Sequence, residues 1–212
     1  MESGVPSTAV LVAFSGASLL VLIVPGPSVV YVVTRSLAQG RRAGLWSALG
    51  LETGAALHVA AATIGLAGVL AASDPALTAV RWAGAAYLVW LAVREFSAAG
   101  RVRSGTPAAH GPARPLRLVR DGILIDVLNP KTATFFLAFL PQFVVPSHGG
   151  VATQFAVLGL VFVTLAGLVD GAYAVLAGRF SPRVRSAGGP GRHLGTAVGG
   201  IYLALAGVAV LA

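Results

Sequence analysis

The sequence predicts an all-α integral membrane protein in which six transmembrane helices form two inverted three-helix repeats. Hydrophobic residues make up 56% of the 212-residue chain and charged residues only 10%, whereas soluble proteins carry about 25% charged residues. Basic residues gather in every second loop, and proline motifs break the first and the fourth apolar run. The composition excludes an ordinary soluble domain. Because the arginines sit in short loops between apolar runs, they do not form the clustered basic face that nucleic-acid binding requires.

Six apolar runs are long enough to cross a bilayer, which takes about 20 residues. We expect no cleavable signal peptide, because the first run is too long for one and no basic segment precedes it. The spans form one membrane domain with a first repeat (residues 1–94), a basic cytoplasmic linker (95–121) and a second repeat (122–212). The expected spans are residues 8–34, 44–71, 76–94, 122–145, 151–178 and 195–212.

The orientation follows from the basic residues. Thirteen of the 15 lie in the loops after the first, third and fifth spans. By the positive-inside rule these loops are cytoplasmic and both termini lie outside. We therefore expect a multi-pass protein of the inner (cytoplasmic) membrane.

The two halves share several features. The first and fourth spans are broken by proline, the second and fifth each carry an acid, and the third and sixth each contain a Gly-x-x-Tyr-Leu motif, at Gly84 and Gly199. An odd number of spans per repeat makes the second copy enter the membrane from the opposite side. Such inverted repeats place the transport site near the midplane, at the repeat interface.

The breaks are Val24-Pro25-Gly26-Pro27 and Asn129-Pro130-Lys131. Proline lacks an N–H donor and displaces the carbonyl four residues earlier, so we expect free carbonyls at Val21, Ile23 and Asp126. Irregular backbone at membrane depth survives only against protein or a water-filled cavity. A simple kink is the alternative, but two breaks in matched positions favour a transport site. The predicted substrate-binding residues are Pro25, Gly26, Pro27, Asn129, Pro130 and Lys131.

Several ionisable residues fall inside the predicted spans. Each costs about 2.5–3.5 kcal/mol at the bilayer centre on insertion scales, so their first interpretation is functional. Glu52, Lys131 and Asp170 lie nine or ten residues from a charged residue at the cytoplasmic edge. At 1.5 Å per residue they sit roughly 15 Å deep, at the middle of the bilayer. A carboxyl that takes up a proton at this depth is what proton coupling requires. Asp170 is the first candidate, followed by Glu52 and Asp126.

Two of these residues have more than one interpretation. Lys131 pairs either with a buried acid, Asp126 or Asp170, or with the carboxylate of a substrate, and the sequence leaves both open. His58 is interpreted as a packing residue rather than a proton relay. No catalytic residue is expected, since no histidine motif of a membrane protease is present. The chain has no cysteine, hence no thiolate ligands, and we expect neither metal nor cofactor.

These residues resemble a known family. Pro25-Gly26-Pro27 followed by Arg35 and Gly40-Arg41 is similar to the first-span signature of the LysE/RhtB amino-acid exporters. Leu128-Asn129-Pro130-Lys131-Thr132-Ala133 resembles the most specific motif of the family. Gly50-x-x-x-Gly54-x-x-x-His58, which fits close helix packing, and Asp170-x-x-Tyr173 also match, so the resemblance covers nearly the whole chain.

The resemblance implies an exporter of amino acids or their derivatives that is driven by the proton gradient. Its expected partners are a small amino acid, protons and the lipid bilayer, with no nucleic acid, and a homo-oligomer is compatible with the sequence. We expect alternating access, with the loops at 25–27 and 129–131 holding the carboxylate and the ammonium of the substrate. Two alternatives stay open: export of a divalent cation, which Lys131 opposes, and a membrane scaffold that transports nothing.

Overall fold

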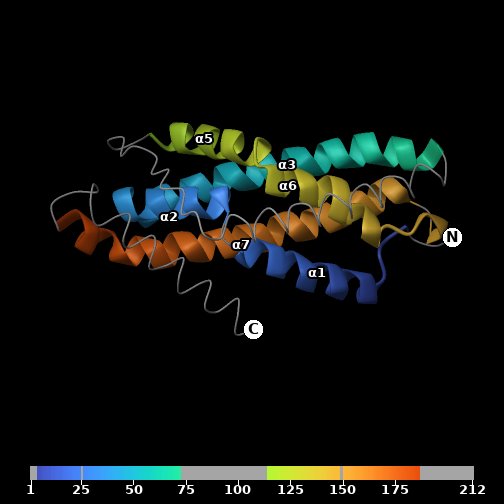
Figure 1. Ribbon diagram of the computed structural model, residues 1–212, viewed down its shortest axis with the longest axis horizontal. Helices are drawn as coiled ribbons and strands as arrows, with labels where there is room; N and C mark the ends of the chain where they lie inside the picture. The colour runs from blue at the N-terminus through green and yellow to red at the C-terminus, as the bar shows by residue number, and fades with distance from the viewer. Residues whose placement is uncertain (1–3, 25, 73–113, 149, 187–212) are drawn as a thin grey trace, which may run out of the picture. The chain divides into compact units, whose positions relative to one another are not determined.

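The computed structural model describes residues 4–24, 26–72, 114–148 and 150–186, and the regular elements of these residues are helices (Figure 1). The expected spans at 76–94 and 195–212, the Gly-x-x-Tyr-Leu motifs and the linker as far as residue 113 lie outside the described residues. The α-helices are α1 (Thr8–Ile23), α2 (Pro27–Gln39), α3 (Arg41–Ala72), α5 (Pro115–Val127), α6 (Pro130–Thr134) and α7 (Val151–Ser186).

Two of these helices, α3 and α7, are long and apolar enough to cross a membrane unaided. Two further pairs satisfy the same criterion as broken spans: α1 with α2, and α5 with the helical turns from Pro130 to Phe143. Each pair is bent by more than 40° at a break of no more than four residues. The described residues therefore contain up to four spans. The two broken ones are those predicted from the sequence as the first and the fourth of six spans.

The helix ends differ from the predicted span ends. Helix α2 continues to Gln39 rather than ending at residue 34, α7 continues to Ser186 rather than 178, and α5 begins at Pro115 rather than 122. The helices extend beyond the expected membrane spans, whose ends were placed where charged residues begin. Arginine side chains extend toward water while their backbone stays helical, and proline suits the first position of a helix.

The fourth span changes its helical geometry after α6. A π-helical turn, η1 (Phe135–Phe139), is followed by two 3₁₀ turns, η2 (Leu140–Phe143) and η3 (Pro146–His148). The N–H of Leu140 bonds to the carbonyl of Phe135, five residues earlier. Pro141 has no N–H with which to continue the ladder, and the helix widens in the turn that precedes it.

The chain divides into two compact units. The described part of unit 1 comprises residues 4–17, 55–72, 130–148 and 150–163. That of unit 2 comprises residues 18–24, 26–54, 114–129 and 164–186. Helices α1, α3 and α7 contribute residues to both units.

Unit 1 is held together by aromatic side chains. The ring centroids of Phe135 and Phe162 are 4.3 Å apart, and those of Phe14 and Phe143 are 5.2 Å apart in an edge-on arrangement. Such aromatic pairs contribute about 0.5–1.5 kcal/mol beyond the area they bury. The side chain of Gln154 bonds to both the N–H and the carbonyl of Val145, at 2.9 and 3.0 Å. This bond pair satisfies the backbone where the fourth span leaves its helical turns.

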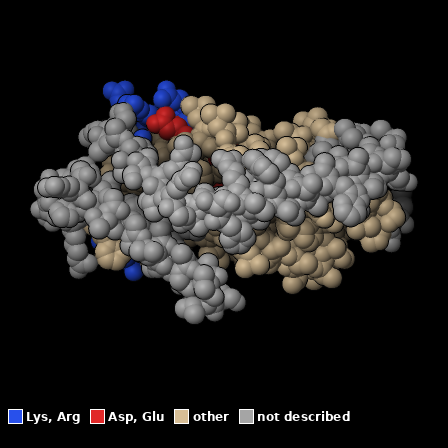
Figure 2. All heavy atoms as spheres, in the orientation of Figure 1, with Lys and Arg blue, Asp and Glu red and all other residues tan. Residues whose placement is uncertain are grey.

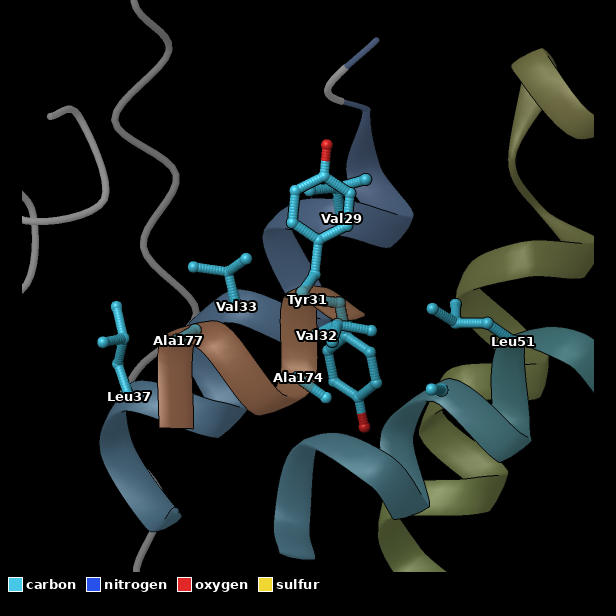
Figure 3. Close-up of a cluster of buried hydrophobic side chains, with 10 residues drawn as sticks. Val29, Tyr31, Val32, Val33, Leu37, Leu51, Ala174 and Ala177 are labelled. Carbon is cyan, nitrogen blue, oxygen red and sulfur yellow. The ribbon is translucent and has the colours of Figure 1, made fainter. Parts of the chain in front are cut away.

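Unit 2 is packed around α2, α3 and α7, whose buried side chains converge in Figure 3. Helices α3 and α5 approach closely at Gly50, which has no side chain. A methyl group at this position would overlap the carbonyl oxygen of Val119. A methyl group at Gly54 would come within 2.7 Å of Asp126 Cβ. The Gly50-x-x-x-Gly54 motif therefore serves helix packing, as predicted. The core of this unit is formed by Val29, Tyr31, Val32, Val33, Leu37, Ala48, Leu51, Tyr173, Ala174 and Ala177.

Candidate functional site

The first break lies between α1, which ends at Ile23, and α2, which begins at Pro27. Gly26 caps α2 with extended backbone, and its carbonyl accepts the first bond of the helix, from the N–H of Val30. The carbonyl of Ile23 lies four residues before Pro27 and accepts a hydrogen bond from the Tyr173 hydroxyl at 3.1 Å. The carbonyl that Pro27 was predicted to expose is thus bonded by a side chain of α7. Pro25 lies outside the described residues.

The second break lies between α5, which ends at Val127, and α6, which begins at Pro130. We expected a free carbonyl at Asp126, and this is wrong. The Asn129 N–H donates to that carbonyl at 2.9 Å, because the chain tightens into a 3₁₀-type turn at the end of the helix. The backbone of this break is satisfied locally, which leaves the side chains of Asp126 and Asn129 for other contacts.

Ser28 joins the two breaks. Its hydroxyl donates to Oδ1 of Asp126 at 3.4 Å and accepts a hydrogen bond from Nδ2 of Asn129 at 3.0 Å. Asp126 and Asn129 are 4% and 3% exposed, and Ser28 between them is half-buried. Two segments about 100 residues apart in the chain are therefore connected by one part-buried polar bridge within unit 2.

The three acids predicted for proton coupling come together in unit 2. Asp126 and Asp170 are both buried, and both act electrostatically on Glu52. The carboxyl oxygens of Glu52 are buried and have no hydrogen-bond partner among the described residues. A methyl group at Gly167 would lie 3.6 Å from Glu52 Cγ, so the small residue on α7 keeps space beside this side chain. In the described part of the chain no group of three His, Cys, Asp or Glu residues has a metal-binding arrangement.

Lys131 and His58 belong to unit 1. Lys131 is partly buried on the first turn of α6, directly after the second break. The His58 ring lies parallel to the Phe136 ring, with an interplanar angle of 11° and centroids 6.0 Å apart, which is the packing contact expected of it. The contact of Lys131 with a substrate or with the acids of unit 2 stays a prediction.

Ser28 and Tyr173 were not predicted as site residues. Ser28 directly follows Pro27, and Tyr173 lies one helical turn beyond Asp170. A polar residue at the first turn of a half-helix is a signal that could have identified Ser28. Tyr173 is harder to identify from the sequence, because the carbonyl that its hydroxyl bonds to lies 150 residues away in the chain.

Comparison with known proteins places this arrangement in a family. The model of the LysE type translocator family matches residues 19–212. A membrane protein of Vibrio cholerae is 32% identical over 84% of this chain and 85% of its own. The homoserine/homoserine lactone efflux protein of Salmonella typhimurium is 32% identical over 82% of each chain, and the leucine efflux protein of Enterobacter sp. is 28% identical over 68% and 67%. No solved structure matches the chain.

The family match covers most of the chain, including both breaks and the acids of unit 2. The relatives of comparable length are membrane proteins, so this is a multi-pass membrane protein that acts as a translocator and not as an enzyme. The chain belongs to the LysE type translocator family.

Proposed function

We propose that this protein exports amino acids or amino-acid derivatives from the cytoplasm, in exchange for protons and by alternating access. The named relatives are efflux proteins for homoserine, homoserine lactone and leucine, which supports this substrate class. The observation that carries the proposal is the Ser28 bridge between the two broken spans. Matched breaks of this kind are the feature that marks the substrate site in transporters built from repeats.

The membrane arrangement that we propose has six spans in two inverted repeats, with both termini outside and the odd-numbered loops cytoplasmic. The matched breaks of the first and fourth spans support this arrangement, as do Glu52 on α3 and Asp170 on α7. In such a fold one repeat rocks against the other around a fixed site. The segments 1–94, 95–121 and 122–212 are then the first repeat, the linker and the second repeat.

The proposed substrate site consists of Pro25, Gly26, Pro27, Asn129, Pro130 and Lys131. The N-terminus of α2 begins at Pro27, and helix N-termini attract carboxylates through their free N–H groups and dipole. Lys131 carries the positive charge of the site and would balance the substrate carboxylate. An acid of unit 2 is the candidate partner of the substrate ammonium.

Proton coupling is assigned to the acids, with Glu52 now ahead of Asp170 and Asp126. A buried ionised carboxylate without a hydrogen-bond donor costs several kcal/mol, so Glu52 is stable when it carries a proton or faces a cation. A proton and the substrate ammonium would therefore compete for the same carboxyl. This competition is what antiport requires, because either occupant excludes the other.

Replacing Glu52 by glutamine is expected to uncouple transport from protons. In everted membrane vesicles, making the interior acidic should raise the accumulation of a labelled amino acid by the wild type about tenfold. This increase corresponds to a driving force of about 1.4 kcal/mol. E52Q should lose this response but keep substrate-for-substrate exchange, which needs no proton release. D170N and D126N are measured alongside. If all three variants keep the full response to the pH gradient, the coupling assignment is wrong.

Growth under toxic amino acids tests the export function itself. Cells that overproduce the protein should tolerate higher concentrations of amino-acid analogues and of dipeptides that release amino acids inside the cell. The panel should span homoserine, leucine, threonine and lysine, since the side chain of the substrate sets the specificity. Resistance to divalent cations instead would support the metal-export alternative, and no resistance to any compound would support a scaffold.

A further inference from the structure

Three arginines converge on the carboxylate of Asp121 at the middle of α5. The distances from the carboxylate oxygens of Asp121 to the nearest guanidinium nitrogens are 3.7 Å for Arg35 of α2, 4.0 Å for Arg117 and 3.0 Å for Arg120. We call these four residues the α5 basic cluster. Figure 2 shows blue Lys and Arg side chains gathered around a red Asp or Glu over this part of α5. One carboxylate balances one guanidinium, so the cluster carries two positive charges in excess.

The arginines of the cluster differ in exposure. The Arg35 side chain is 12% exposed and its guanidinium lies 5.4 Å from the centre of the Tyr31 ring. The Tyr31 hydroxyl donates to the Leu118 carbonyl at 2.9 Å. Arg35 and Tyr31 thus form an inner contact between α2 and α5. The Arg117 and Arg120 side chains are 53% and 66% exposed, which leaves most of their donors facing outward.

The exposed arginines lie on the apolar outer face of α5. Leu116, Arg120, Leu124 and Leu128 follow one another at four-residue intervals, which places them in one row along the helix. The three leucines are 80%, 51% and 76% exposed, whereas Leu118 and Gly122 on the opposite face are buried. Leu124 and Leu128 lie on the membrane side of Arg120 and would face acyl chains, whereas Leu116 lies at the cytoplasmic edge. Arg120 therefore lies about 6 Å along the axis from a lipid-facing leucine.

We propose that Arg117 and Arg120 bind the phosphate group of an anionic phospholipid whose chains pack along this leucine row. Guanidinium groups are suited to phosphate oxygens, which they bind in a bidentate manner. The excess positive charge favours a lipid with a net negative headgroup, and the leucines favour a lipid over free phosphate. Once the lipid holds Arg117 and Arg120, Asp121 is left to Arg35, which strengthens the contact between α2 and α5. The site is independent of the exported substrate.

Thermal unfolding of the purified full-length protein tests this site. At constant total lipid in detergent micelles, phosphatidylglycerol should raise the Tm of the wild type by about 3 °C or more relative to phosphatidylcholine, as a ligand of the folded state does. R117Q/R120Q should lose this shift, while R117K/R120K keeps part of it because charge remains. The matched control, R42Q/R179Q, removes two exposed arginines elsewhere in unit 2 and should keep the full shift.

Three outcomes would overturn the proposal. The first is an equal Tm shift in R117Q/R120Q, which means that the lipid binds elsewhere. The second is loss of the shift in R42Q/R179Q as well, which indicates attraction by net charge rather than a site. The third is an equal shift with inorganic phosphate in place of the lipid, which would identify a free-anion site. Native mass spectrometry of the same variants should report one fewer retained phosphatidylglycerol for R117Q/R120Q.

Discussion

Replacing Lys131 by methionine is expected to reduce efflux to below about a hundredth of the wild-type rate, a loss of about 2.7 kcal/mol. Methionine keeps much of the apolar stem and removes the charge that would balance the substrate carboxylate. The variant should still insert into the membrane, because a positive charge inside the bilayer opposes insertion and K131M removes it. Efflux of a labelled amino acid from preloaded cells, normalised to the amount of protein in the membrane, measures the effect. Normal efflux from K131M would show that Lys131 does not bind the substrate carboxylate.

The arginine variant and a chemical probe separate binding from structure. K131R keeps the charge on a bulkier group and should retain part of the efflux that K131M loses. Lys131 is the only lysine in the sequence, so a membrane-permeant amine reagent modifies one side chain besides the N-terminus. A transported amino acid should slow this modification more than the same concentration of a non-transported amino acid, because both consume reagent equally and only the first covers Lys131. A structural ion pair of Lys131 would leave no difference between the two.

The sequence was sufficient for the parts of the fold that rest on proline and on apolar length. Pro27 and Pro130 removed backbone donors at fixed positions, and the helices break there. Run length identified α3 and α7 as spans. The ends were less predictable, because helices such as α5 continue where the arginines begin.

The sequence pointed to candidate residues of the site but not to their contacts, and the roles of these residues stay predictions. The depth estimate grouped Glu52 and Asp170 with Lys131, whereas the structure places Glu52 and Asp170 in unit 2 and Lys131 in unit 1. The estimate gave no information on helix rotation, so it could not show that Ser28 faces Asp126 and Asn129. Nor could it show that Asn129 bonds to the carbonyl of Asp126, since local turns at a helix end depend on the backbone path rather than on the proline alone.

Replacing Asn129 by alanine is expected to cost about 1–3 kcal/mol of stability, because buried partners of the amide lose a hydrogen bond. Efflux per folded molecule should also fall about tenfold or more, since the two breaks are no longer connected through Ser28. Thermal unfolding measures the first effect, and efflux normalised to folded protein measures the second. S28T keeps the hydroxyl and is the conservative control. If N129A changes stability while efflux per folded molecule stays normal, the bridge is structural only.

A double-mutant cycle determines whether the bridge acts as one unit. S28A removes both hydrogen bonds of the serine, so adding N129A to it should cost little more than either change alone. The expected coupling between the two positions is about 0.5–3 kcal/mol, the range for residues in one hydrogen-bond network. Additive losses would mean that Ser28 and Asn129 act independently. The same cycle measured on efflux should show the same sign of coupling. In alternating access the two broken spans have to move together, and a bridge that joins them contributes to transport only while both of its ends are intact.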